Sequence, residues 1–196
     1  MTRRLGLLVT DASPLITLAA GEALECLTMP GLPVIIPDMV YDEVTRDLAR
    51  IGARAIVGWA DRHLDQVFVR PTEVFAEFQV LRSLDPTIRS RGRGEQAALE
   101  VLNKAIAVDD DLEAVLVFED ADVKTRRFVR ALPERVLTLS TGDLLHELEA
   151  AGRIQSADHI LDVAAAKDRN VTAQRQMQSD TVDARAALRA RLRGQI

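Results

Sequence analysis

The chain has few of the residues that usually mark a disulfide-bonded or zinc-binding protein. It contains one cysteine, Cys26, so neither an internal disulfide nor a cysteine-based zinc cluster can form. Its three histidines, His63, His146 and His159, show no metal-ligand spacing. A bound metal ion would therefore depend on oxygen ligands, which favour Mg²⁺, Mn²⁺ or Ca²⁺ over zinc.

Aromatic residues and long hydrophobic segments are also scarce. Five Phe, one Tyr and one Trp are the only aromatic residues, so the core must be built mainly from aliphatic side chains. The apolar segment from Leu5 to Val9 is ended by Asp11, well short of a secretory or membrane-spanning segment. No later segment reaches about 18 uncharged residues. We therefore expect a cytoplasmic protein with no membrane partner.

The length and charge of the chain set wider limits. A chain of 196 residues that is 47% hydrophobic and 28% charged is typical of a globular protein with one core and a small appendage. Its formal net charge of −5 argues against binding a polyanion by global electrostatics. A site in which acids surround divalent cations can still bind one, because the cations invert the local field.

Short apolar segments alternate with amphipathic ones, which is typical of a parallel sheet covered by helices on both faces. We predict a three-layer α/β/α fold with a short central sheet. The expected strands are Leu7–Asp11, Val34–Ile36, Ala114–Phe118 and Val136–Leu139, with Val67–Val69 as either a strand or an extended connection. The expected helices are Pro14–Ala20 with Ser13 as N-cap, 38–50, 53–63, 72–84, 95–106, 122–132, 141–152, 156–166 and 171–193.

Two acids occupy positions where the pattern expects an apolar residue. Asp11 ends a strand that should be buried on both faces, and ligands of open parallel sheets gather at the carboxyl ends of the strands. Glu95 lies three and four residues before Ala98 and Leu99, on the core-facing side of its helix. A buried carboxylate requires a cation or hydrogen-bonding partners. The alternatives are a capping aspartate and a first-turn glutamate that reaches water.

Other acids give weaker indications when taken singly. Glu43 stands at the boundary of an apolar helix face, and its neighbours Asp42 and Asp47 are ordinary solvated acids. The segment from Glu119 to Asp122 follows a predicted strand, so its acids either complete a site with Asp11 or stabilise the start of the next helix. The run Asp109–Asp111 precedes that strand and belongs to the opposite edge.

Together these residues resemble the PIN-domain family, and in particular the VapC-like toxin ribonucleases. The matching segments occur in family order: VTDASPLITLA, VIIPDMVYDEV, GRGEQAALEVL, AVLVFEDADVKTRRFVRAL and VLTLSTGDLLHELEAAGRI. They span about Leu7–Ile154, so we expect a PIN-like nuclease domain over residues 1–154 and a helical C-terminal extension over residues 155–196.

The resemblance implies RNA phosphodiester hydrolysis with one or two Mg²⁺ or Mn²⁺ ions. The implied catalytic and metal-binding residues are Asp11, Glu43, Glu95, Asp120 and Asp122, with Ser13 and Glu119 as auxiliary residues. The family's fourth acid falls in a stretch that carries an extra residue, Ala121, so Asp120 and Asp122 share that assignment. Toxins of this kind imply a cognate antitoxin and a homodimer as partners.

Basic residues give further hypotheses. Arg89, Arg91 and Arg93 flank Glu95 on a glycine-containing loop and are candidate ligands of RNA phosphates, although surface solvation explains each one equally well. An Arg-rich segment, Asp183–Arg193, forms either a solvated helix, a dimer contact or a helix that restrains an acidic site.

Two other classes of function compete with the nuclease interpretation. The first is a PIN-like RNA-binding or protein-interaction module that does not turn over a substrate. The second is another aspartate-dependent α/β protein. A phosphatase would usually show an Asp-x-Asp pair at the first strand, and a receiver-like domain would show paired acids there and a late lysine. Neither pattern is present, because Ala12 and Ser13 follow Asp11.

Overall fold

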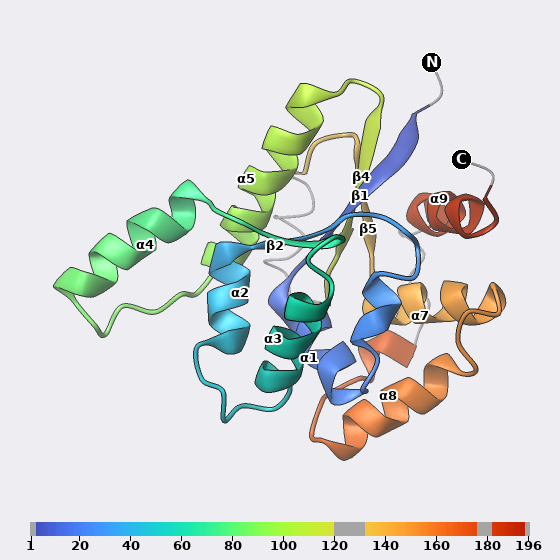
Figure 1. Cartoon of the computed structure of the whole chain (residues 1–196), viewed down its shortest axis with the longest axis horizontal. Coiled ribbons are helices and arrows are strands. Elements are labelled where there is room, and N and C mark those ends of the chain that lie inside the picture. The colour runs from blue at the N-terminus through green and yellow to red at the C-terminus, as the bar shows by residue number, and fades with distance from the viewer. Residues whose placement is uncertain (1–2, 120–131, 176–181, 195–196) are drawn as a thin grey trace.

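Five parallel strands form a single sheet at the centre of the computed structural model, which describes residues 3–119, 132–175 and 182–194 (Figure 1). The strands are β1 (Arg4–Thr10), β2 (Val34–Pro37), β3 (Val67–Arg70), β4 (Leu112–Val117) and β5 (Val136–Leu139), in the order β3-β2-β1-β4-β5. In the register, Leu8 lies opposite Val34 of β2, and Val9 lies opposite Leu116 of β4. The central strand β1 therefore presents its carboxyl end between those of β2 and β4.

Helices cover both faces of the sheet, so the predicted three-layer α/β fold is confirmed. The α-helices are α1 (Ala12–Ala20), α2 (Asp38–Thr45), α3 (Ala53–Arg62), α4 (Glu73–Leu84), α5 (Arg93–Val108), α7 (Thr141–Ala150), α8 (Ala157–Ala166) and α9 (Val182–Leu192). Two short 3₁₀ helices, η1 (Leu24–Leu27) and η2 (Ala173–Arg175), lie between them. Figure 1 shows α4 extending away from the rest of the molecule.

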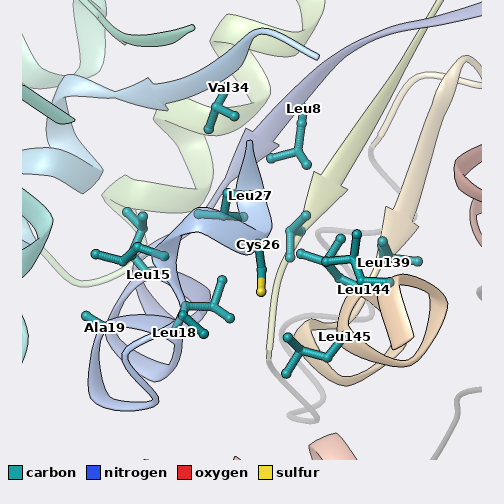
Figure 2. Close-up of a cluster of buried hydrophobic side chains, with 14 of the residues drawn as sticks. Leu8, Leu15, Leu18, Ala19, Cys26, Leu27, Val34, Leu139, Leu144 and Leu145 are labelled. Atoms are coloured by element: carbon teal, nitrogen blue, oxygen red, sulfur yellow. The ribbon is translucent and has the colours of Figure 1, made fainter. Parts of the chain in front are cut away.

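Alternation along the strands divides the core between the two faces. Leu8, Val115 and Val117 join the larger cluster, whereas Val9 and Leu116 join the smaller one, which packs against α5. Figure 2 shows the larger cluster, in which side chains from the strands meet side chains of α1, η1 and α7: Leu8, Val34 and Leu139 with Leu15, Leu18, Leu27, Leu144 and Leu145. This packing fixes the position of α1, and with it the end of β1.

The first helix begins at Ala12 and its N-cap residue is Asp11, so the prediction that Ser13 is the N-cap was wrong. Ser13 and Pro14 instead lie within the first turn of α1. Proline is tolerated there because the first N–H groups of a helix have no intrahelical acceptor. The Asp11 side chain makes no capping hydrogen bond. Its carboxylate therefore does not cap the start of the helix.

Several element boundaries differ from those expected. The segment Val67–Arg70 is a strand, which decides the alternative left open by its sequence. Helix α2 ends at Thr45 rather than Arg50, and the carboxylate of Asp47 accepts the N–H of Ala49 in a turn that competes with the helix. The apolar stripe of α5 includes Ala97 and Val101, while Leu99 is only partly buried. The helix expected over 122–132 lies outside the described residues.

The run Asp109–Asp111 lies at the amino edge of the sheet, as expected. The carboxylate of Asp109 pairs with Arg4 at the start of β1, with 2.8 Å between Nη2 and Oδ2. These acids therefore stand at the edge opposite to Asp11.

The helices after residue 155 pack into the same core as the strands. Leu161 and Ala164 of α8, and Ala184 and Leu188 of α9, belong to the larger apolar cluster. No helix within the described ranges is long and apolar enough to cross a membrane.

Candidate functional site

Two of the predicted acids converge on a glycine at the carboxyl edge of the sheet. Asp11 follows β1, Glu43 lies in α2, and Gly94 lies in the first turn of α5. A Cβ atom added to Gly94 would lie 3.6 Å from Oδ1 of Asp11 and 3.8 Å from Oε2 of Glu43. Three segments that are far apart in the sequence thus place two carboxylates around one small gap.

The third predicted acid, Glu95, follows Gly94 in the first turn of α5. The helix begins after Gly92, whose φ of 76° is in the left-handed region that glycine adopts without strain. The carboxylate of Glu95 lies 3.8 Å from where a Cβ of Gly92 would be, so it turns back toward the start of the helix. Glu95 is half-buried, and the adjacent Gly94 is buried.

Among the described residues, the neighbouring side chains that most affect the pKa of Asp11 are all negatively charged. Burial raises the pKa of Asp11 to about 6, a hydrogen bond from the Ala12 backbone opposes this rise, and the negative charges of Glu43, Glu95 and Glu119 add to it. The pKa of Glu43 is also raised, chiefly by burial. The arginines at positions 46 and 50 oppose that rise. The site is therefore an acidic cluster that would be stabilised by an added cation.

Glu119 lies near this cluster but already has a cation of its own. Its side chain is only 3% exposed, accepts a hydrogen bond of 2.8 Å from the Thr17 hydroxyl, and lies 3.4 Å from Nη2 of Arg169. Burial raises the pKa of Glu119, whereas Thr141, Thr17 and Arg169 oppose that rise. Arg169 follows α8 and carries no motif, so sequence reasoning did not identify it.

The predicted auxiliary residue Ser13 and two hydroxyl groups at the start of α7 are placed differently from one another. Ser13 is half-buried in the first turn of α1, and its backbone carbonyl accepts a hydrogen bond of 3.3 Å from Arg169. Ser140 is the N-cap of α7, where its hydroxyl oxygen accepts the N–H of Asp143 at 3.0 Å. Thr141 is buried in the first turn of α7, next to Glu119.

The three predicted RNA-binding arginines are not equivalent. Arg89 and Arg91 are exposed on the loop before α5. Arg93 is the first residue of α5, and its guanidinium lies over the ring of Phe78, 5.5 Å from the centroid. The guanidinium of Arg46 lies 5.7 Å from the same centroid. Sequence reasoning did not identify Arg46, because only the packing of α4 brings Phe78 against it.

The geometry of the acidic cluster can be compared with the needs of a divalent cation. Asp120 and Asp122 lie outside the described residues. Within residues 3–119, 132–175 and 182–194, no group of three or more Asp, Glu, His or Cys side chains is placed to hold a metal ion. Asp11 and Glu43 nevertheless offer the oxygen donors that Mg²⁺ and Mn²⁺ prefer, and Mg²⁺ is commonly bound by one or two carboxylates with water completing its shell. The gap at Gly94 leaves space beside both carboxylates, so these residues fit such an ion.

The fold and the site together define an α/β protein with an acidic site at the carboxyl edge of a parallel sheet. The family model DUF3368, described as a PIN domain, matches residues 7–177. The chain therefore belongs to this PIN-domain family, and PIN domains are generally nucleases that usually bind divalent metals. Searches among curated proteins and among solved structures found no match.

Proposed function

We propose that this PIN-domain protein is a divalent-metal-dependent endoribonuclease that hydrolyses RNA phosphodiester bonds. The observation that carries the proposal is the convergence of Asp11 and Glu43 on the gap at Gly94. Asp11 is half-buried, and the neighbouring charges that most affect it among the described residues are negative, an arrangement that favours binding of a cation. A resident Mg²⁺ or Mn²⁺ ion would make this arrangement favourable and would give it a catalytic use.

In this proposal the cation is held by Asp11, Glu43 and Glu95, with Asp120 and Asp122 as the fourth part of the site. When bound, the ion would supply an activated water and neutralise charge that develops on the phosphate. Ser13 and Glu119 have auxiliary roles. Glu119, with its charge held by Arg169, adds negative potential at Asp11 and so strengthens cation binding.

No histidine is needed as a general base in this scheme, and the contacts of the three histidines agree with that. His63 contacts the carboxylate of Glu25 at 2.9 Å, and His146 lies 3.7 Å from Glu149. His159 is exposed on α8. The carboxylates themselves then have to orient the attacking water and accept its proton.

The test is cleavage of a labelled single-stranded RNA in the presence of Mn²⁺. Replacing Asp11 with Asn removes one charged oxygen ligand, so we expect the rate to fall at least about 100-fold. The matched control is Asp61→Asn, which changes an exposed aspartate of α3 and should leave the rate unchanged. Equal rates for Asp11→Asn and the unmodified chain would overturn the assignment.

The second candidate is a PIN-like RNA-binding or protein-interaction module without turnover. It is favoured by the lack of a three-ligand metal group among the residues that the structure describes. The same assay distinguishes the two functions. An unmodified chain that binds the RNA in the presence of Mn²⁺ but never cleaves it would support the module and exclude the enzyme.

At the level of the cell, we propose that the nuclease is the toxin of a toxin–antitoxin pair, with a cognate antitoxin and a homodimeric form. The support is the resemblance of its motifs to VapC-like toxins. Induction of the chain should arrest growth, and Asp11→Asn should abolish the arrest. Size-exclusion chromatography with light scattering tests the homodimer. Continued growth during induction of an active, folded chain would exclude the toxin role and leave the nuclease proposal intact.

A further inference from the structure

A buried aromatic ring brings two arginines together beside the acidic cluster. Phe78 of α4 is fully buried, and the guanidinium groups of Arg46 and Arg93 lie 5.7 Å and 5.5 Å from the centre of its ring. Each distance is within the range of a cation–π interaction. Arg46 follows α2 and Arg93 begins α5, so the ring joins the helices that carry Glu43 and Gly94.

The helix that carries this ring is fixed at its N-terminus to those same two helices. The carboxylate of Asp38 at the start of α2 accepts the hydroxyl of Thr72 at 2.6 Å and its N–H at 3.0 Å. The carboxylate of Glu100 in α5 accepts the N–H of Glu73 at 2.9 Å. Phe78 is the only residue of α4 that is buried. The ring is therefore a fixed support, although most of α4 faces solvent.

The two arginines differ in how their charges are balanced. Arg46 pairs with Asp42 on α2, where Nε donates to Oδ2 at 2.9 Å. Arg93 forms no ion pair with a carboxylate among the described residues. It also occupies the first position of a 16-residue helix, where the helix dipole disfavours a positive charge. An anion bound at Arg93 would pair with its charge and would also offset its unfavourable interaction with the helix dipole.

The position of Arg93 beside the acidic cluster indicates that this anion is a phosphate of a nucleic acid. Arg93 directly precedes Gly94, which lies against the carboxylates of Asp11 and Glu43. Arg46 lies three residues after Glu43, at the C-terminal end of the same helix. A nucleic-acid strand that places one phosphate at the acidic cluster must place its neighbouring phosphates on either side. Arginine suits this ligand, because its planar guanidinium matches phosphate oxygens.

We propose that Arg93, supported by the ring of Phe78, binds the RNA phosphate next to the scissile one, and that Arg46 shares this support. The inference rests on the proposed nuclease function and adds to it how the strand is held. It also separates Arg93 from Arg89 and Arg91, which have no such ring contact among the described residues. In this arrangement α4 positions the phosphate-binding residue without contacting the reacting atoms.

The experiment measures binding of a short fluorescein-labelled single-stranded polyuridine by anisotropy. Full-length Asp11→Asn protein with Mg²⁺ serves as the parent, so that the RNA stays intact, and the measurement is repeated over a series of salt concentrations. Adding Arg93→Met keeps an apolar side chain on Phe78 and removes the charge. We expect about tenfold weaker binding. The slope of log K against log salt should fall by about 0.7, the value for one lost phosphate contact on a single strand.

Two further variants distinguish the effect of the Arg93 charge from the effect of the Phe78 ring that positions it. Arg93→Lys keeps the charge and loses the planar stack, so the salt slope should stay the same while the affinity falls by a smaller factor. Phe78→Leu removes the ring from beneath both guanidinium groups, and it should weaken binding without changing the number of charges. Thermal denaturation of each variant checks its fold. If Phe78→Leu does not fold, the two Arg93 variants still decide the question.

The matched control is Arg62→Met, which removes an exposed arginine at the end of α3. It should change neither the affinity nor the salt slope. An Arg93→Met variant that binds as its parent does, with the same slope, would overturn the inference while cleavage by the unmodified chain still stands. A parent that binds no RNA, together with an unmodified chain that cleaves none, would instead overturn the proposed function itself.

Discussion

Asp11 and Glu147 are both acids placed inside the protein, but their surroundings are opposite. The side chain of Glu147 in α7 is 2% exposed, and two arginines of α9 bind it: Arg185 at 2.9 Å and Arg189 at 2.7 Å. Although burial raises the pKa of Glu147, hydrogen bonds from Arg189 and Arg185 outweigh it, so the pKa is lowered. The pKa of Asp11 is raised to about 6, because burial and three neighbouring acids act on it.

The difference shows which of the two acids has its charge balanced by arginines of the protein itself. The fold supplies the counter-charges of Glu147 from its own C-terminal helix, and Glu147 in turn holds α9 against α7. Among the described residues, no such ion pair forms with Asp11. Glu119 is intermediate, since within the described part of the chain one arginine, Arg169, faces it. Arg185 and Arg189 of α9 thus contact Glu147 rather than the cluster at Gly94. The first group is a structural contact, and the second is the candidate site.

The largest expected effect is at Glu147. Replacing it with Ala leaves two arginines without their buried carboxylate, and we expect the free energy of unfolding to fall by about 4 kcal/mol. Urea denaturation measures this loss, and Glu77→Ala on the exposed face of α4 is the control. Because the pKa of Glu147 is lowered, its stabilisation is present above its ordinary value of 4.5. The difference between the two proteins should therefore shrink as the pH falls below that value. A small loss at neutral pH would show that α9 is held mainly by its apolar face.

Asp11→Asn should raise the free energy of unfolding, which is the opposite of the effect expected at Glu147. Since the pKa of Asp11 rises from 3.8 to about 6, its ionisation destabilises the metal-free fold by up to about 3 kcal/mol above that range. The asparagine variant should therefore be more stable than the unmodified chain at neutral pH in EDTA. The advantage should shrink as the pH falls from about 6 to about 4 and vanish below the ordinary value of 3.8, because Asp11 is then protonated in both the folded and the unfolded state. Thermal denaturation over that pH range measures it. A less stable variant at neutral pH would contradict the assignment of Asp11 as an uncompensated charge.

A substitution of Arg169 tests the contribution of its ion pair with Glu119 to stability. Replacing it with Met removes the only basic side chain that faces Glu119 among the described residues, so we expect a loss of about 2 kcal/mol in unfolding free energy. The second substitution Glu119→Gln should recover part of that loss, because the remaining buried group is then neutral. Urea denaturation of the two single variants and the double variant forms a mutant cycle. Additive losses would mean that the two residues do not interact.

The smallest effect concerns the gap at Gly94. A methyl group there would make ordinary contacts of 3.5 Å to 3.8 Å with Val40, Asp11 and Glu43, so Gly94→Ala should fold normally. The methyl group would fill the space beside both carboxylates, and we expect Mn²⁺ affinity to fall about tenfold, or about 1.4 kcal/mol. Isothermal titration calorimetry measures the affinity. Gly58→Ala in α3 is the control, since it makes the same substitution in a helix away from these acids. Unchanged Mn²⁺ binding by Gly94→Ala would place the ion elsewhere.

Much of the fold could be predicted from the sequence because it depends on local patterns. The alternation of apolar and amphipathic segments predicted the parallel sheet and its helices, and the five strands lie close to the predicted segments. The position of Asp11 at the end of β1 follows from the strand alone. The start of α1 could not be predicted as well, because Asp11 and Ser13 are both good N-cap residues and the packing of α1 decides between them.

The sequence by itself determined where acids interrupt apolar patterns, and this was enough to select Asp11 and Glu95. The tertiary structure decided what surrounds each charge. Arg169 faces Glu119, Arg46 and Arg93 meet on Phe78, and the arginines of α9 bind Glu147. The physical reason is that periodicity shows which side of an element is buried, whereas the partner of a buried charge comes from an element far away in the chain. Only the packing of helices on the sheet brings such partners together.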